Sequence, residues 1–546
     1  MTNAMAGIVL QNRLRTLKSA AADECDFLLA VEHQGAATRF QQQIARETDS
    51  IVAVVRHHLR LHPDDRCVVL PPDSWIKGGF NLCVFIDIQS CKWAQSRRVV
   101  FRCPLPHKLA EKYFPGTIDE KVSCEAGAYS WMQEHCIDIR IPQLYAFGLT
   151  DGSHFSHARL RPWYLRFWHW VRRRLYGFLK YPLLSEYIQD LSTPAVSTSY
   201  MLLEFIGPET GRMLSETWAE HRHDPRRRAR LFCGMAYIVL SLARLPQPRI
   251  GSFRLNQSDG TVALTNRPLT STMMIFENSG APRTMQPHQV YRNTDTFASD
   301  MLTMHDTYFL HYRHAVEDEE DARERMAIRM MLWAVMHHFI LPDRRHGPFL
   351  PQLTDLHQSN IFVDQDWNVT CLIDLEWICA LPVEMLHAPH WLTDGGLDTI
   401  IDDCEAFDEA RRAFLAAMDV QTTTTPLAHD IPITHIMEES WVSKSVWFWG
   451  CITSINCWLF IFEDHIVPKF CAEKCTPFNF KQLSAFWKQD VDKVVQTKVE
   501  DEKRYQADLR ALFSNQGAPK QSPNPAGAND LPSAARGKEV YHSIHP

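Results

Sequence analysis

Residues 353–364 read LTDLHQSNIFVD, and residues 372–377 read LIDLEW. Together they have the form D-x-x-x-x-N, then a hairpin, then two apolar residues followed by Asp. The hairpin is predicted because short apolar islands at 361–363 and 369–373 flank the polar stretch DQDWN. A loop followed by a hairpin brings the polar residues on both sides together at one end, so we expect them to form one site.

Three polar residues in these stretches have the chemistry of phosphoryl transfer: Asp355, Asn360 and Asp374. That reaction needs one carboxylate to orient the attacking hydroxyl and accept its proton, and a second carboxylate plus an amide oxygen to hold Mg²⁺ on nucleotide phosphates. Mg²⁺ prefers hard oxygen ligands and takes few of them from protein. A D-x-x-x-x-N match also occurs by chance, and a turn explains any single Asp or Asn, so further motifs in the right order are needed.

The chain before this motif has the pattern of a small antiparallel sheet with one helix. A turn of small and polar residues at 74–81 separates the first two β-rich runs. A helix is predicted over 119–135, because Asp119 and Glu120 suit the positive N-terminal end of a helix. The predicted strands occupy residues 67–70, 82–88, 99–102, 143–148 and 200–206.

The flanking regions are predicted to be mainly helical. Residues 1–60 carry apolar side chains near a period of 3.6, and residues 207–487 have a helical pattern apart from the hairpin. A strong buried helix is expected at 326–340. Residues 445–462 are uncharged but include polar side chains, which favours a buried amphipathic helix over a membrane span. The tail at 514–546, rich in Pro, Gly, Ala, Ser and Asn, is predicted to be disordered.

Composition bounds the class of protein. The chain has 546 residues, which leaves room for about two to four domains. Hydrophobic residues make up 45% and charged residues 22%, an ordinary globular balance. The formal net charge of −7 argues against nucleic acid as a partner. The 15 cysteines are scattered and include no C-x-x-C pair, which indicates a reducing compartment.

The N-terminus does not have the pattern of a secretory signal, because its first apolar run precedes the positive charges. We therefore expect a cytoplasmic protein. A mitochondrial location is the alternative, since Arg13, Arg15 and Lys18 occur with no acid before Asp23. A surface helix is the favoured interpretation of that segment.

Arginines and aromatic residues interleave in the segment 151–198. The favoured interpretation is a helix that packs its aromatic side chains on the core and leaves its arginines in solvent. The alternative is a weak contact with an anionic membrane surface through residues 159–180.

The motifs together resemble the aminoglycoside phosphotransferase family of the protein-kinase-like fold, and most closely its large fungal branch. The resemblance covers roughly residues 65–480. Besides the two stretches quoted first, the family-like segments are residues 79–81, 119–121, 265–269 and 389–393.

The resemblance implies an α+β, two-lobed fold. The small nucleotide-binding lobe would have an antiparallel sheet plus a helix at 65–206, with the segment 151–198 as an insertion. The large catalytic lobe, mainly helical, would span 207–490. A helical extension at 1–64 would precede them, and the disordered tail would follow.

The resemblance also implies roles for individual residues. Asp355 would be the catalytic base, and Asn360 and Asp374 would be the Mg²⁺ ligands. Gly78 and Gly79 would lie in the turn over the phosphates of ATP, where the lack of side chains lets backbone N–H groups approach an anion.

The remaining nucleotide-binding residues come from the small lobe. Glu125 matches the acid that pairs with a cation on the third strand, and Arg102 stands where that cation is normally Lys. Glu204, Phe205 and Ile206 would form the hinge whose backbone binds adenine.

Two departures from the family pattern bear on activity. Arg at position 102 keeps the charge but presents a planar fork instead of an ammonium, so the change is not conservative. Leu353 replaces a His that normally braces the catalytic loop, which puts the geometry of that loop in question.

Two functions are consistent with the sequence. The first is an ATP- and Mg²⁺-dependent phosphotransferase acting on a hydroxyl of a small-molecule acceptor. The second is a degenerate kinase-like module that binds nucleotide or a partner without turnover. They are separated by whether Arg102 lies next to Glu125 and within reach of Asp374.

Several other residues have weaker signals. Acids that could line an acceptor pocket are Asp402, Asp403, Glu405 and Glu409. Glu376 could face the site, Trp377 is expected in the core, and His357 is equally suited to contact substrate or to brace the loop. The metal-like pairs His387/His390 and Cys471/Cys475 lack further ligands nearby, which favours structural roles.

Overall fold

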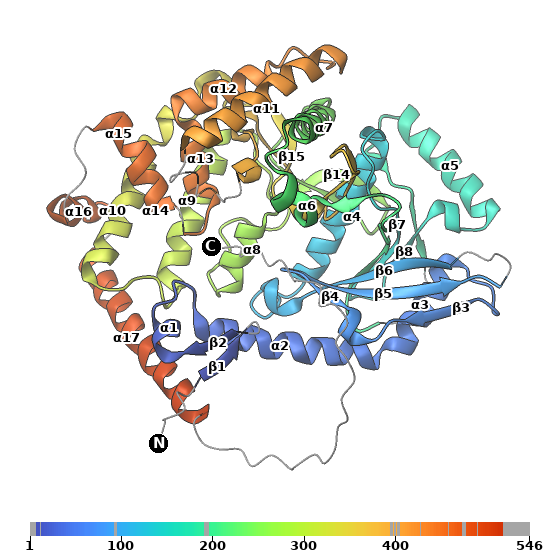
Figure 1. The fold of residues 1–546 in the computed structure, drawn as a ribbon, viewed down its shortest axis with the longest axis horizontal. Helices are drawn as coiled ribbons and strands as arrows, with labels where there is room; N and C mark the ends of the chain where they lie inside the picture. Colours follow the sequence, from blue (N-terminus) through green and yellow to red (C-terminus); the bar gives the residue numbers. More distant parts are fainter. Residues whose placement is uncertain are drawn as a thin grey trace.

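The computed structural model describes residues 7–10, 13–91, 96–190, 196–393, 397, 400, 404–425, 427–456, 458–471, 477–488 and 490–516. Helices and antiparallel sheets are mixed in it (Figure 1), and helices dominate the second half of the chain. The α+β class predicted from the sequence, with an antiparallel sheet plus a helix followed by a mainly helical region, is confirmed. No helix among the described residues is long and apolar enough to cross a bilayer.

The largest sheet contains every strand that was predicted before residue 207. Its order is β10-β8-β7-β11-β6-β5-β3, with β4 also paired to β5, and each pairing is antiparallel. Its strands are β3 (Arg66–Val69), β4 (Ile76–Lys77), β5 (Asn81–Gln89), β6 (Ser96–Pro104), β7 (Leu144–Gly148), β8 (His154–His157), β10 (Tyr187–Asp190) and β11 (Tyr200–Glu204).

Both faces of this sheet are covered. On β11, Tyr200 and Leu202 pack in the same cluster as the helix α3 (Thr48–Leu59). Met201 and Leu203, which alternate with them, pack in the cluster of the helix α4 (Thr117–His135). Because successive side chains of a strand point to opposite faces, a central strand between two layers must be apolar throughout.

The second sheet was not predicted. Residues 207–487 were expected to be helical apart from one hairpin, but a five-stranded antiparallel sheet crosses this region in the order β15-β18-β13-β14-β9. Its short strands carry no alternating pattern, because both of their faces are buried. They are β9 (Leu183–Leu184), β13 (Gly251–Leu255), β14 (Thr261–Asn266), β15 (Phe349–Leu353) and β18 (Ile378–Pro382).

The predicted hairpin is confirmed as β16 (Ile361–Val363) and β17 (Val369–Leu372), and β12 (Arg212–Met213) pairs with β16 as a third strand. The helices around these sheets are α6 (Leu214–His221), α7 (Pro225–Ala243), α8 (Ser271–Asn278), α9 (Thr294–His311), α10 (Glu319–Val335), α11 (Cys404–Thr424), α12 (Ile433–Ser443), α13 (Ser445–Thr453), α14 (Trp458–Ile461), α15 (Val467–Phe470), α16 (Pro477–Ser484) and α17 (Val491–Gln516).

Two predicted helical regions differ in detail. The first 60 residues include the helices α1 (Leu17–Ala21), α2 (Phe27–Arg46) and α3, but also the hairpin β1 (Gly7–Leu10) and β2 (Arg13–Thr16). The segment 445–462 is buried as predicted, yet it is broken between α13 and α14. The predicted disordered tail lies outside the described residues from 517 onward.

The two ends of the described chain meet. Helix α17 runs beside the N-terminal hairpin (Figure 1), and the backbone N–H of Phe27 donates to the hydroxyl of Tyr505 over 3.0 Å. The rings of Phe27 and Phe513 stack with centroids 5.7 Å apart. Residues before the first sheet are thus held to the mainly helical region as well as to the sheet.

Candidate active site

The loop between β15 and β16 brings Asp355 and Asn360 together. The side-chain amide of Asn360 donates to the backbone carbonyl of Asp355 over 2.9 Å, which leaves Asn360 Oδ1 for another partner. The backbone N–H of Ile373 donates to the carbonyl of Asn360 over 2.9 Å. The last bond ties the loop to the residue that precedes Asp374, so the three predicted residues lie at one end of the hairpin.

The loop is braced by backbone and side-chain contacts on both sides of Asp355. The backbone N–H and hydroxyl of Thr354 both donate to the carbonyl of Trp377, at 3.2 and 2.8 Å. The indole of Trp391 donates to the carbonyl of Leu356 over 2.7 Å. Leu353 itself pairs with Ile378 as the last residue of β15. These contacts fix the backbone of the loop on both sides of Asp355.

Arg102 connects the small sheet to this loop. It projects from β6, and its side chain is only 7% exposed. The guanidinium donates to Glu125 on α4 over 2.8 Å and to Glu376 over 2.9 Å, and it also bonds Asp374. Arg102 therefore lies next to Glu125 and within reach of Asp374, which is the arrangement that separates the two functions.

A second buried cation, which sequence reasoning missed, completes the cluster. Lys121 lies one turn before Glu125 on α4, and its side chain is fully buried. Its ammonium lies 2.5 Å from Glu376, 2.9 Å from the amide oxygen of Asn81 and 3.3 Å from Glu125. The i,i+4 spacing of Lys121 and Glu125 was the available signal. Lys121 and Glu376 are 255 positions apart in the sequence, so no local pattern could predict their contact.

The cluster holds more negative than positive groups. Arg102 and Lys121 face the carboxylates of Glu125, Glu376 and Asp374, and Asp355 adds a further acid close by. Buried charges are stable only when they are paired. An excess of buried carboxylate with few partners is a suitable environment for a cation.

The titration of these acids reflects that excess. Burial, together with the charges of Asp374 and Glu376, raises the pKa of Asp355 to about 7. Burial also raises the pKa of Asp374, although Arg102 opposes the shift. The pKa of Glu376 is lowered instead: burial opposes this, but Lys121 and Arg102 outweigh it. Glu376 is thus held in its charged form by the two cations that it pairs with, Arg102 and Lys121.

The Gly78–Gly79 turn is fixed by a backbone hydrogen bond and by the burial of the residue that follows it, Phe80. It links β4 to β5 and is exposed, and the N–H of Gly78 donates to the carbonyl of Asn81 over 2.8 Å. Phe80 is buried against Trp377, with ring centroids 5.0 Å apart. Trp377 therefore lies in the core as predicted. A Cβ on Gly78 would make only ordinary contacts, the nearest at 3.7 Å, so packing does not require a glycine there.

The predicted hinge follows the end of β11. The backbone N–H of Glu204 already donates to Gln143 over 2.9 Å, and its carboxylate accepts from Gln143 and Arg140. Phe205 packs edge-on against Phe85. Both the backbone and the side chain of Glu204 thus have structural partners.

An apolar surface lies next to the hinge. Ile206 packs with Phe362 and Cys371 from the hairpin in one small cluster, against which Met213 and Ile373 also pack. The hinge and the hairpin that precedes Asp374 therefore share a small apolar wall.

The other candidate residues lie apart from this site. Glu405 and Glu409 are exposed on α11, while Asp402 and Asp403 lie outside the described residues. The rings of His387 and His390 stack with centroids 4.0 Å apart beside α11, and burial lowers the pKa of both. Cys471 is exposed, and Cys475 lies outside the described residues. His357 is exposed and caps the turn of Ser359.

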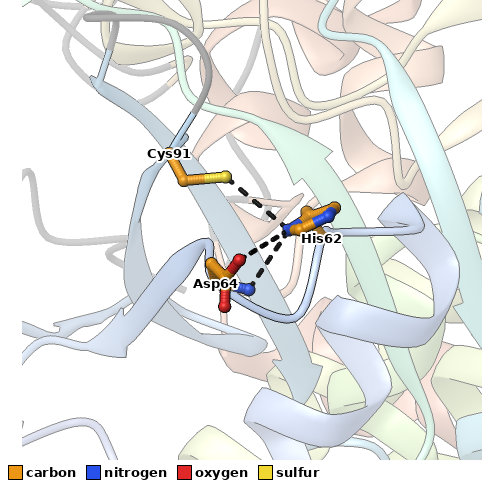
Figure 2. Close-up of side chains that lie close together, drawn as sticks. All are labelled: His62, Asp64 and Cys91. Carbon is orange, nitrogen blue, oxygen red and sulfur yellow. Dashed lines mark hydrogen bonds and ion pairs between the residues drawn. The ribbon is translucent and has the colours of Figure 1, made fainter.

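A separate polar cluster lies where the α3–β3 loop meets the end of β5 (Figure 2). His62 Nδ1 is 3.4 Å from the carboxylate of Asp64 and 3.7 Å from the thiol of Cys91. Local turn bonds account for it, since Asp64 N–H also reaches His62 Nδ1 and the carboxylate of Asp65 accepts from the backbone N–H groups of His62 and Cys91. We read it as a contact that joins two loops.

Comparison with known proteins gives weak similarities. No family model matches the chain, and no curated protein matches it. One similar solved structure is a thermostable mutant of the aminoglycoside phosphotransferase APH(4)-Ia in ternary complex with AMP-PNP and hygromycin B. It has 11% identity and a TM-score of 0.31, over 86% of this chain and 99% of that chain. Another is a macrolide 2'-phosphotransferase type I, with 11% identity and a TM-score of 0.25, over 81% of this chain and 97% of that chain.

Proposed function

We propose that the protein is an ATP-dependent phosphotransferase that moves the γ-phosphate to a hydroxyl of a small-molecule acceptor. The observation that carries this proposal is the position of Arg102, bonded at once to Glu125 and to Asp374. A degenerate module has no need to keep this linkage between the small sheet and the Asp355–Asn360 loop. The second candidate, nucleotide or partner binding without turnover, is therefore less well supported.

Asp355 is the group that we assign as general base. A base works best when its pKa lies near the working pH, and burial together with Asp374 and Glu376 raises the pKa of Asp355 to about 7. Its carboxylate has no hydrogen bond to a described residue, so it is available to orient a substrate hydroxyl. The bond from Asn360 to the Asp355 backbone holds the loop without occupying that carboxylate.

The donor set fits Mg²⁺. Asn360 Oδ1 and the Asp374 carboxylate are hard oxygen ligands, and the carboxylates of the cluster outnumber the two cations that face them. A bound Mg²⁺ would neutralise charge on the phosphates. Asp374 and Asn360 would then hold the metal, and Arg102 would orient Asp374 while its own charge faces the phosphates. Lys121, fully buried, would position Glu125 and Glu376 without touching nucleotide.

A small molecule is the acceptor class that we favour. In protein kinases a long activation segment separates the metal-binding Asp from the next conserved motif. Here Asp374 is followed almost at once by Glu376, which anchors Arg102 and Lys121, and by the strand β18. This leaves no comparable segment directly after Asp374 on which a protein substrate could dock.

The experiment compares the wild type with Asp374→Asn and Asp355→Asn, and with Asp366→Asn as a matched control on the exposed hairpin turn. Thermal stability is measured with ATP, with and without Mg²⁺, and turnover is then screened against hydroxyl acceptors. We expect Mg²⁺–ATP to stabilise the wild type and the control, and Asp374→Asn to abolish that effect. Asp355→Asn should still bind but lose turnover by about 10²–10⁴-fold.

Two results would overturn the proposal. One is a folded wild type that shows no metal-dependent ATP binding. The other is turnover that survives in Asp355→Asn. Circular dichroism of each variant separates loss of binding from loss of fold, since Asp374→Asn also removes a partner of Arg102.

A further inference from the structure

Helix α5 (Trp163–Phe178) has no buried residue. It lies at the edge of the molecule beyond β7 and β8 (Figure 1). Trp163 is 77% exposed, Trp168 67% and Phe178 84%. The favoured expectation that a helix in this segment packs its aromatic side chains on the core is therefore wrong, because six of the seven Trp, Tyr and Phe side chains of α5 are at least half exposed.

That inner side is held by polar contacts. His169 Nε2 lies 2.9 Å from the carbonyl of Ser185, and Arg173 donates to the carbonyl of Leu184 over 2.9 Å. Arg173 also pairs with Glu134 and Glu186. The helix is thus fixed to the body of the protein in one orientation, so its other side always faces outward.

The outward side is an apolar stripe. At about 100° per residue, positions 163, 167, 171 and 178 fall on one face, and they are Trp, Phe, Val and Phe. The exposed Arg174 falls on the same face among them. Tyr164, Trp168 and Leu175 extend this face on one flank, and each is at least half exposed. Isolated exposed apolar residues are ordinary on a protein surface, whereas a contiguous patch of this kind marks an interaction site.

Positive charge surrounds the stripe. Between Asp151 and Glu186 the sequence has no acidic residue, although the whole chain carries a net charge of −7. Arg166, Arg174 and Lys180 are exposed and make no ion pair with a described residue. The basic residues of the segment are Arg159, Arg161, Arg166, Arg172, Arg173, Arg174 and Lys180.

We propose that α5 docks the protein on the surface of an anionic lipid bilayer. A helix with one apolar aromatic face and flanking Arg or Lys lies in the plane of the membrane interface, where Trp and Tyr are favoured. The basic residues would be attracted to anionic headgroups. The helix has 16 residues, too few to span a bilayer, so it would lie on the membrane and not cross it.

The test uses the full chain and vesicles of phosphatidylcholine with or without phosphatidylserine. One variant removes the stripe (Trp163→Ser, Phe167→Ser, Phe178→Ser), and another reverses charge (Arg166→Glu, Arg174→Glu). Matched controls make the same kinds of change at exposed positions elsewhere: Ile137→Ser, Val442→Ser and Phe486→Ser for the stripe, and Arg39→Glu with Arg226→Glu for the charge.

We expect the wild type and both controls to cosediment with phosphatidylserine vesicles, more weakly as salt is raised. Each α5 variant should bind about tenfold less or weaker still. No binding by the wild type would overturn the proposal. So would a charge-reversal variant or a stripe variant that binds as well as its control. A wild-type dimer that only the stripe variant dissociates, without vesicle binding, would assign the stripe to a second copy instead.

Discussion

Helices α4 and α5 follow one another in the chain and have similar lengths, 19 and 16 residues, yet their surroundings are opposite. Every residue of α4 from Glu120 to Met132 is buried, including Lys121 and Glu125. No residue of α5 is buried, including its tryptophans. Polarity along the chain would suggest the reverse, since α5 is the more aromatic of the two.

The difference shows that a charged side chain can be buried when other residues supply partners for its charge, and stays exposed when they do not. Lys121 can be fully buried because Glu125, Glu376 and Asn81 surround its ammonium. Arg174 has a neighbouring Trp170 ring, 5.5 Å from its guanidinium, but no acid among the described residues. One cation is a structural part of a site, and the other remains available for an external partner.

The largest expected effect would come from removing the buried cation. Lys121→Ala leaves Arg102 as the one described cation facing the carboxylates of Glu125, Glu376 and Asp374, so we expect a loss of about 3–5 kcal/mol of unfolding free energy. Arg174→Ala on α5 should change it by no more than about 0.5 kcal/mol. Urea denaturation of both variants measures the contrast. Equal losses of unfolding free energy in the two variants would show that the buried Lys121 contributes no more to stability than the exposed Arg174.

A pair of glycines sharpens the comparison with a smaller effect. A Cβ at Gly127 on α4 would lie 2.9 Å from the backbone of Phe253, whereas one at Gly177 on α5 meets nothing within 4 Å. Gly127→Ala should therefore destabilise the protein by about 1–3 kcal/mol, because backbone atoms cannot move aside. Gly177→Ala should be neutral or stabilising by up to about 1 kcal/mol, since alanine favours helix. Thermal unfolding should show a lower midpoint for Gly127→Ala, and an unchanged or higher midpoint for Gly177→Ala.

The smallest expected effect depends on pH and belongs to the buried cluster alone. The pKa of Asp355 in the folded protein is about 7, above the value of about 4 for an unfolded chain. Between these values the folded state holds the proton and the unfolded state does not, so rising pH costs stability. Asp355→Asn removes that cost.

We expect Asp355→Asn to be more stable than the wild type by about 1–2 kcal/mol at pH 8, a figure reduced for partial exposure, and nearly equal at pH 5. Measurements with EDTA exclude metal binding. A stability difference that is constant with pH would contradict the raised pKa of Asp355. Arg166→Gln and Arg174→Gln on α5 serve as controls, because arginine does not titrate in this range.

Local patterns in the sequence predicted the parts of the fold whose signals are local. The hairpin after Asn360, the helix that contains Glu125 and the five strands before residue 207 all have a period or a turn within a short window. The strands β13, β15 and β18 do not, since they are short and largely buried on both sides. A local sequence pattern cannot distinguish such strands from short pieces of an apolar helix.

The candidate site was predicted only in part for the same reason. Asp355, Asn360 and Asp374 share one motif, so their proximity follows from the hairpin. The contacts of Lys121 and Asn81 with Glu376 join residues about 250 to 300 positions apart, which no spacing rule detects. Periodicity shows that α5 has an apolar side, but not whether another element covers it.

The contact of Gly127 with Phe253 has a consequence for how the chain could be divided. Helix α4 lies against β13 of the second sheet, and Arg267, which directly follows β14, bonds Glu120 near the start of the helix. A cut of the chain after Ile206 would therefore separate α4 from the second sheet, one of the two sheets on which it packs. Segments on either side of that position would be expected to assemble when produced together and to aggregate when produced singly.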